Sequence, residues 1–214
     1  MTYVLWDWNG TLLDDTAACI ATLNAMLARR GVKPITREFY REHFSFPVRP
    51  FYERIGVKLA DEDWDALAQE YHDTYHAQPL SPNAETFAAL EAVRAAGAGQ
   101  SIISALRQDL LERDTARFGI DRYMEHVYGV DNLDGGSKLA RARELVERIV
   151  AAVPGRDLVL IGDALHDYEV ARELGVRAVL FAGGGHSRRR LSAVAPTGDT
   201  LMECVQMALA RSGS

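Results

Sequence analysis

The segment Tyr3-Val4-Leu5-Trp6-Asp7-Trp8-Asn9-Gly10-Thr11 decides the fold of this chain. Four apolar residues run without a break and stop at an aspartate, and a turn containing glycine follows. A short apolar run that ends at a polar turn is typical of a parallel strand buried on both faces. The segment therefore predicts a strand at 3–6 that delivers Asp7 to one edge of a sheet.

Four further apolar runs follow along the chain, and patterns with helical spacing of apolar residues lie between them. Because strand and helix alternate, we predict a three-layer α/β fold with a Rossmann-like parallel sheet between two layers of helices. The predicted strands are 100–104, 126–130, 157–161 and 177–181, and the predicted helices are 84–96, 108–118, 138–150 and 165–174.

The stretch after the first strand breaks this alternation. Glycines and prolines separate four successive helical patterns, and Thr36 and Asp61 are residue types that cap helix N-termini. We therefore predict a helical insertion at 15–82 within an α/β core made of residues 1–14 and 83–214. The predicted helices of the insertion are 16–30, 36–44, 47–55 and 61–76.

The composition excludes several classes of protein. Hydrophobic residues make up 48% of the 214 residues, as in ordinary globular proteins, and the formal net charge of -6 argues against binding to nucleic acid. We expect neither a signal peptide nor a membrane span, because no apolar run approaches the roughly 20 residues that a span requires. Cys19 and Cys204 are too few for a disulfide framework. We expect a cytoplasmic protein with reduced thiols that binds neither nucleic acid nor membrane.

Polar side chains follow the predicted strands at the points where these end. Asp7, Ser104 and Asp163 come directly after apolar runs, Asp167 lies one helical turn later, and Lys138 opens the helix after the third strand. Ligands bind beyond the carboxyl ends of the strands in open parallel sheets, so we expect these side chains to meet. Carboxylate oxygens suit Mg²⁺, and a cation with an ammonium group suits a phosphoryl group.

These residues resemble the four motifs of the haloacid dehalogenase superfamily, and the resemblance covers essentially the whole chain. The family's Asp-x-Asp-Gly-Thr motif corresponds to residues 7–11, and its Gly-Asp-x-x-x-Asp motif corresponds to residues 162–167. Its isolated Ser or Thr and its isolated Lys correspond to Ser104 and to Lys138 in Gly136-Ser137-Lys138. The predicted helical insertion is similar to the family's first (C1) type of cap domain.

The resemblance implies a phosphatase similar to phosphoglycolate phosphatases, which uses Mg²⁺ to hydrolyse the phosphate ester of a small metabolite. It implies that Asp7 is the nucleophile, forms an aspartyl-phosphate and binds Mg²⁺ together with the main-chain carbonyl of Asn9, Asp163 and Asp167. Lys138 would also offset the crowding of negative charge. The residues that would contact the phosphoryl group are Gly10, Thr11, Ser104, Ala105 and Lys138.

Asn9 departs from the family pattern, because the family has there an aspartate that protonates the leaving oxygen and later activates water. An amide cannot exchange a proton in this way, and general acid–base catalysis typically contributes about 10² to 10⁴ in rate. Three interpretations stay open: His166 supplies the proton, the substrates are reactive phosphates, or the chain is a degenerate member that binds a phosphorylated ligand or a partner with little turnover. A phosphotransferase or mutase would also need the missing group.

Arg49 is a candidate for contact with the rest of the substrate. It lies between Pro47 and Pro50, and a guanidinium can bind a carboxylate or a phosphate through paired hydrogen bonds. A solvated arginine is the alternative. The aromatic residues around it are expected to pack inside the insertion, and these are Phe44, Phe46 and Phe51.

Overall fold

Six parallel strands form one sheet in the computed structural model, which describes residues 1–131 and 137–210. The order across the sheet is β3-β2-β1-β4-β5-β6, so the first strand lies in the middle. Parallel neighbours require crossover connections, which explains why helices alternate with strands along the chain. The strands are β1 (Thr2–Trp6), β2 (Gly99–Arg107), β3 (Val127–Val130), β4 (Asp157–Gly162), β5 (Arg177–Phe181) and β6 (Thr197–Gly198).

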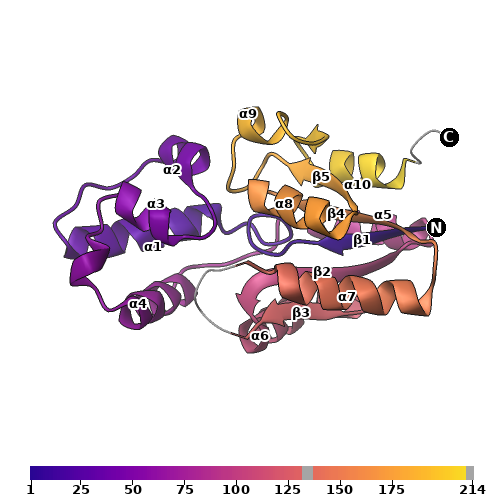
Figure 1. Cartoon of the computed structure of the whole chain (residues 1–214), viewed down its shortest axis with the longest axis horizontal. Helices are drawn as coiled ribbons and strands as arrows, with labels where there is room; N and C mark the ends of the chain where they lie inside the picture. The colour runs from indigo at the N-terminus through magenta and orange to yellow at the C-terminus, as the bar shows by residue number, and fades with distance from the viewer. Residues whose placement is uncertain (132–136, 211–214) are drawn as a thin grey trace.

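Helices cover both faces of this sheet (Figure 1). Tyr3 and Leu5 pack with one set of helices, whereas Val4 and Trp6 point to the other face and pack with the other set. All four side chains are fully buried, which is why this run contains no charged residue. The first set is α7 (Leu139–Ala152) and α8 (Leu165–Leu174), and the second is α5 (Thr86–Ala95), α6 (Gln108–Phe118) and α10 (Leu201–Leu209).

Four helices between β1 and α5 form a separate helical lobe beside the carboxyl edge of the sheet (Figure 1). The Thr36 hydroxyl accepts a hydrogen bond from the Phe39 N–H at 3.1 Å and so caps the second of them, as predicted. The prediction that Asp61 caps the fourth helix was wrong. Asp61 ends a short 3₁₀ turn, and the Asp63 carboxylate caps the helix instead. The helices are α1 (Thr16–Arg29), α2 (Arg37–His43), α3 (Arg49–Arg54) and α4 (Trp64–His76).

The predicted α/β fold is confirmed, with differences at the ends of elements. All five predicted strands are present, but β2 continues past Ser104 to Arg107, with a shift of its register against β3 between Ile103 and Arg107. The two-residue strand β6 and the four-residue helix α9 (Arg188–Leu191) were not predicted. Elements this short carry no periodic pattern that a sequence can reveal.

The register of β1 against β4 brings two chemically important turns together. Trp6 is aligned with Ile161, and the Asp7 N–H donates to the Ile161 carbonyl oxygen at 2.8 Å. Asp7 therefore leaves β1 at the level at which the chain leaves β4 for Asp163. The two central strands of the sheet thus end side by side at the helical lobe.

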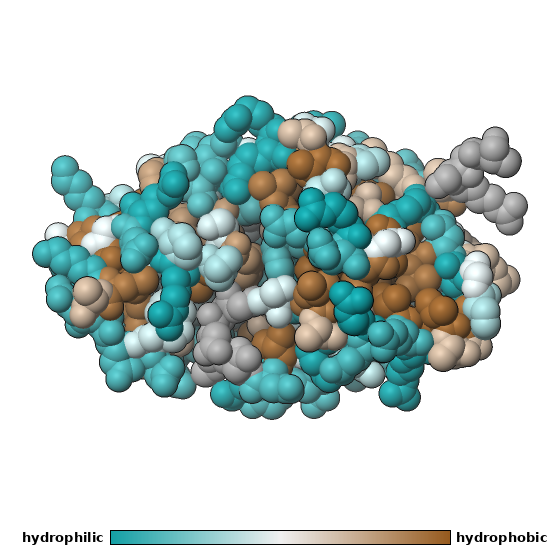
Figure 2. Space-filling model, viewed as in Figure 1, coloured by the Kyte–Doolittle hydropathy of each residue, from teal (hydrophilic) through white to brown (hydrophobic). Residues whose placement is uncertain are grey.

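Among the described residues, no helix is both long enough and apolar enough to cross a bilayer. Figure 2 shows hydrophilic residues along the outline of one face, with hydrophobic residues gathered mostly over the half that contains the sheet.

Candidate active site

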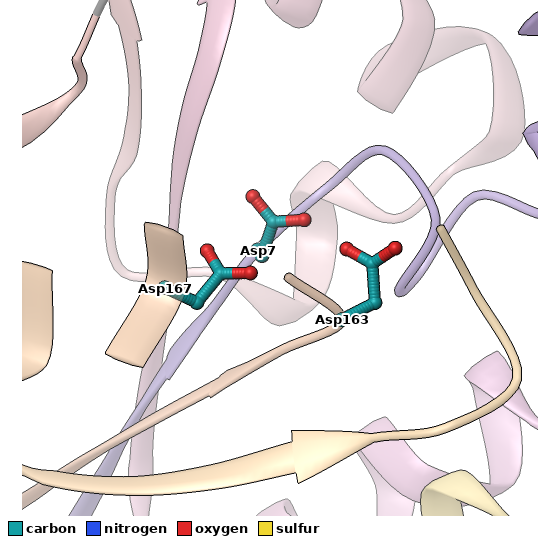
Figure 3. Close-up of side chains that lie close together, drawn as sticks. All are labelled: Asp7, Asp163 and Asp167. Atoms are coloured by element: carbon teal, nitrogen blue, oxygen red, sulfur yellow. The ribbon is translucent and has the colours of Figure 1, made fainter. Parts of the chain in front are cut away.

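Three aspartates meet at the carboxyl edge of the sheet (Figure 3). One carboxylate oxygen from each of Asp7, Asp163 and Asp167 lies within 4.8 Å of one from each of the others, and all three side chains are buried. Asp7 follows β1, Asp163 follows β4 and Asp167 lies in the first turn of α8. The three carboxylates predicted from the motifs are therefore brought together by two segments: the turn after β1, and the stretch from the end of β4 into the first turn of α8.

Lys138 connects two of these aspartates. Its ammonium group forms ion pairs with Asp7 and, at 2.7 Å, with Asp167, and it donates to the Ile103 carbonyl oxygen at 3.2 Å. The side chain is 2% exposed, as far from water as the core residues around it. As predicted, Lys138 directly precedes α7. Gly136, which belongs to the same motif, lies outside the described residues.

The charges of this cluster do not cancel. Three carboxylates and one ammonium leave an excess of negative charge in a buried site. Burial raises the pKa of Asp7 to about 7 although Lys138 opposes the shift, and the nearby Asp167 adds to it. Burial and the charges of Asp7 and Asp167 raise the pKa of Asp163 well above its usual value. Burial also disfavours ionised Asp167, but Lys138 outweighs it and the pKa of Asp167 is lowered.

The turn after β1 is shaped to approach this cluster closely. Gly10 has φ of 75°, and a Cβ atom at this position would collide with the Asp163 carboxylate, so both the conformation and the space require glycine. Thr11 is fully buried, and its hydroxyl lies 3.3 Å from Asp7 Oδ2 and 3.4 Å from Asp163 Oδ1. The Gly185 N–H donates to Asp163 from the loop after β5.

The Asn9 side chain is hydrogen-bonded to another buried carboxylate, that of Asp15. The Asn9 amide donates to Asp15 Oδ2 at 2.7 Å and to the Tyr75 hydroxyl at 2.9 Å. Tyr75 donates to Asp15 at 2.5 Å, and the Gly10 N–H donates to the other Asp15 oxygen at 2.7 Å. The Cys19 thiol lies 3.6 Å from the same carboxylate. Asp15 thus joins the turn after β1 to helix α4 of the helical lobe.

Sequence reasoning missed Asp15. It is 1% exposed, and burial raises its pKa, although the Tyr75, Asn9 and Gly10 donors oppose that shift. The available signal was the pair Asp14-Asp15 directly after the first motif and at the start of a helix. Such a pair reads as helix capping, but the structure exposes Asp14, buries Asp15 and shows no side-chain capping bond from Asp15.

The remaining candidates take different places. Ser104 and Ala105 line the same cavity as Asp7 and Lys138, and the Ser104 hydroxyl accepts from the Leu106 N–H at 3.0 Å. His166 lines it too, and its Nε2 is buried without a hydrogen-bond partner.

Arg49 does not reach the cavity. It is exposed, and its guanidinium lies 4.2 Å from the centre of the Trp64 ring, because that aromatic face attracts the cation.

A cavity of about 170 Å³ runs from the aspartates into the helical lobe. Its walls combine the strand-end residues with side chains of α1, α3, α4 and the segment that joins α2 to α3. Phe46 borders it and is only half-buried, whereas the sequence predicted that this ring packs inside the insertion.

A family model described as "Haloacid dehalogenase-like hydrolase" matches residues 4–181, and the chain therefore belongs to this family. The matched residues include Asp7, Lys138, Asp163 and Asp167. The resemblance that the motifs suggested is thus confirmed.

The names of similar curated proteins include both phosphatases and a protein kinase. A phosphoglycolate phosphatase of Caulobacter vibrioides is 27% identical over 190 residues, which are 85% of this chain and 79% of the relative. The tyrosine-protein kinase PtkA of Mycobacterium tuberculosis is 26% identical over 86% of this chain and 63% of its own length. A crystal structure described as a predicted phosphatase from Clostridium acetobutylicum has a TM-score of 0.77 at 17% identity and covers 97% of this chain and 98% of that one, which shows a shared fold.

Replacing Asp15 by alanine should lower the free energy of unfolding by about 3 kcal/mol or more, because several buried donors lose their acceptor at once. Tyr75→Phe removes one of these donors and should cost about 1 to 2 kcal/mol. Urea denaturation measures both. Asp14→Ala, at the exposed neighbour, is the matched control and should change stability little. An equal, small effect of both aspartate substitutions would contradict the network described above.

Proposed function

We propose that this chain is a Mg²⁺-dependent hydrolase of small phosphomonoesters, in which Asp7 is the nucleophile. The observation that carries the proposal is the buried cluster of Asp7, Asp163 and Asp167 around Lys138. The phosphatases among its relatives support the reaction class. The proposed substrate is a small phosphorylated metabolite rather than nucleic acid or a membrane, and the proposed location is the cytoplasm.

The donor set fits a divalent cation. The three buried carboxylates carry more negative charge than Lys138 balances, and hard oxygen donors are the ligands that Mg²⁺ prefers. The residues that would hold the ion are Asp7, Asp163, Asp167 and Asn9, the last through its main-chain carbonyl. The ion would supply positive charge that lets one anion approach another.

The protein's own groups divide the remaining tasks. An Asp7 carboxylate oxygen would attack phosphorus, and water would then hydrolyse the aspartyl-phosphate and restore Asp7. Lys138, Thr11 and Ser104 would hold the phosphoryl oxygens, since all three lie beside Asp7 or line the same cavity. The Asn9 amide is engaged with Asp15 and cannot donate and recover a proton during the reaction.

We infer that residues 15–82 act as a cap on a core made of residues 1–14 and 83–214. The cavity lies between this helical lobe and the strand ends, so closing the lobe would exclude water from the aspartates. The Asn9 amide of the turn after β1 donates to the Tyr75 hydroxyl of α4 at 2.9 Å. Arg41 of α2 donates to the carbonyl oxygens of Ala182 and His186. These two polar contacts support a docked cap.

Asp7→Asn should lower the turnover of p-nitrophenyl phosphate at least about 10³-fold, because the substitution removes the nucleophile. Asp14→Asn changes an exposed carboxylate in the same segment and should leave the rate unchanged. The release of phosphate in the presence of Mg²⁺ measures the turnover rate. A test for phosphoryl groups transferred to protein in the same samples distinguishes hydrolysis from kinase-like transfer. Equal rates for wild type and Asp7→Asn would contradict the proposal.

Mg²⁺ should stabilise the fold more at pH 8 than at pH 5.5. The pKa of Asp7 is raised to about 7 in the folded protein and is about 4 in the unfolded chain, so the metal-free fold binds extra protons in this window. Metal-free stability should therefore fall as the pH rises toward 7, while Mg²⁺ gains ionised ligands. At a hundredfold excess over Kd, the melting temperature should rise by roughly 5 to 10 °C at pH 8.

The control for this measurement compares a variant of a carboxylate inside the aspartate cluster with a variant of a carboxylate outside it. Asp163→Asn should raise the metal-free melting temperature at pH 8 and remove most of the Mg²⁺ effect. Asp199→Asn, at an exposed residue paired with Arg188, should keep the effect. A Mg²⁺ effect that is independent of pH and survives Asp163→Asn would place the ion elsewhere.

Restoring the family's acid–base aspartate at position 9 should require a second change. Asn9→Asp alone would place two carboxylates where an amide now donates to Asp15 at 2.7 Å, and the pair would have to share a proton. In a double variant that also carries Asp15→Asn, the amide oxygen at position 15 could still accept from the Gly10 N–H. The amide nitrogen at position 15 could donate to the new carboxylate at position 9.

The double variant should therefore hydrolyse alkyl phosphates about 10² to 10⁴ faster than wild type, whereas Asn9→Asp alone should gain less and be less stable. Values of kcat/KM against pH and the melting temperatures of the three proteins measure this. A double variant that is no faster than wild type would show that the missing proton donor does not limit the rate.

A further inference from the structure

The part of the cavity beyond the aspartates is built mostly from aromatic and aliphatic side chains, although Thr16, His72 and His166 also line the cavity. The aromatic and aliphatic side chains come from the helical lobe and from the end of β2, and several are rings that contact one another. Phe44 lies 5.2 Å from Phe46 and 5.3 Å from Phe51 between ring centres, both edge to face. The principal members of this aromatic wall are Phe44, Phe46, Phe51, Tyr52, Trp64 and Leu106.

No lysine or arginine is available there to bind a second anionic group. Among the described residues that line the cavity, Lys138 is the one lysine or arginine, and it is already paired with Asp7 and Asp167. Arg49 lies over Trp64 outside the lining, and Arg41 is engaged by two main-chain carbonyl oxygens. A carboxylate on the substrate would therefore be buried against rings without a free guanidinium or ammonium group to pair with, which is unfavourable.

The size of the cavity suits a small substrate. The whole cavity, including its end at Asp7 and Lys138, holds about 170 Å³. An apolar cavity of roughly 150 Å³ in a protein core is sufficient to bind benzene. Phe46 is placed to contact such a ring next to the reacting end, because its own ring lies 5.1 Å from that of His166, next to Asp167 in the sequence.

The chemistry at position 9 points to the same kind of substrate. A phenolate has a conjugate acid with a pKa of about 10, whereas an alkoxide resembles hydroxide and is a far stronger base. A phenolic oxygen can therefore leave without being protonated in the transition state, and an alkyl oxygen depends far more on a general acid. Asn9 provides no such acid.

We propose that the substrates of this enzyme are aryl phosphomonoesters, with the ring held by the aromatic wall and the phosphate held at Asp7 and Lys138. This proposal rests on the proposed function and names its substrate class. Asp7 forms a bond to phosphorus as the bond from phosphorus to the phenolic oxygen breaks, and the electron pair leaves with that oxygen, which takes a proton from water. Hydrolysis of the aspartyl-phosphate then gives phosphate, so the sum is aryl phosphate plus water to phenol plus phosphate.

The first experiment compares kcat/KM for three esters with Mg²⁺. Phenyl phosphate offers a ring and a phenolic leaving group, benzyl phosphate offers a ring and an alkyl one, and 2-phosphoglycolate offers a carboxylate and an alkyl one. We expect phenyl phosphate to exceed benzyl phosphate by about 10² to 10⁴, the typical contribution of a general acid, and benzyl phosphate to exceed 2-phosphoglycolate. A phosphotyrosyl peptide is assayed beside phenyl phosphate, to distinguish a free aryl phosphate from a phosphorylated tyrosine side chain as the source of the aryl ester.

The second experiment measures binding without turnover. Benzylphosphonate should bind about 10 to 100 times more tightly than phosphonoacetate in calorimetry with Mg²⁺, because its ring is buried against apolar side chains. Phe46→Ala should remove most of this preference by weakening benzylphosphonate alone, and Phe46→Leu should keep part of it. Phe39→Ala, in the same region of the lobe but outside the lining, is the matched control and should leave both affinities unchanged.

The outcomes separate the two proposals. If 2-phosphoglycolate is the best ester, or if phosphonoacetate binds as tightly as benzylphosphonate, the aryl assignment is overturned while phosphatase activity stands. If benzyl phosphate matches phenyl phosphate, the argument from the leaving group is wrong and the assignment to phenolic esters falls. If no ester is hydrolysed but benzylphosphonate binds with the expected preference, the proposed hydrolysis fails and the recognition of an aromatic ring remains.

Discussion

Electrostatic repulsion among buried carboxylates is the constraint on which the site depends. Asp7, Asp163 and Asp167 are held together by the ends of β1 and β4 and by α8, so they cannot move apart without disturbing the sheet. Lys138 balances part of their charge. The surrounding loops adapt to the same cluster: Gly10 leaves room for Asp163, and the Gly185 N–H donates to it. The positions of Lys138, Gly10, Gly185 and the proposed cation all follow from this one concentration of negative charge.

The pair Asn9 and Asp15 is best understood as one unit. A buried carboxylate remains close to the turn after β1, but it lies at position 15, and the amide at position 9 is one of its donors. Because burial allows only one ionised group at this point, a change at either position alters what the other must be. The loss of the usual aspartate is therefore accompanied by a network that holds the amide in place and connects the site to α4 through Tyr75.

The family membership and the cavity contribute different information. Membership establishes the fold and the hydrolase class, whereas the names of relatives range from phosphoglycolate phosphatase to tyrosine-protein kinase. The aromatic wall is contributed by the helical lobe, which in this chain places Phe46 and Trp64 at the cavity and leaves Arg49 outside it. The proposed substrate preference thus depends on side chains of this chain's own helical lobe.

The sequence alone determined the alternating strands and helices and the helical stretch between them. It also determined the positions of Asp7 and Asp163 at strand ends and of Lys138 at a helix start, because all of these depend on local patterns of apolar and polar residues. Three features needed the tertiary structure: the burial of Asp15 and its bond to Asn9, the packing of Arg49 on Trp64, and the exposure of Phe46 to a cavity. Each depends on how α1 to α4 pack against the edge of the sheet. Contacts between segments far apart in sequence leave no periodic signal, since a charged or aromatic residue looks the same in a chain whether it faces solvent, a ring or a substrate.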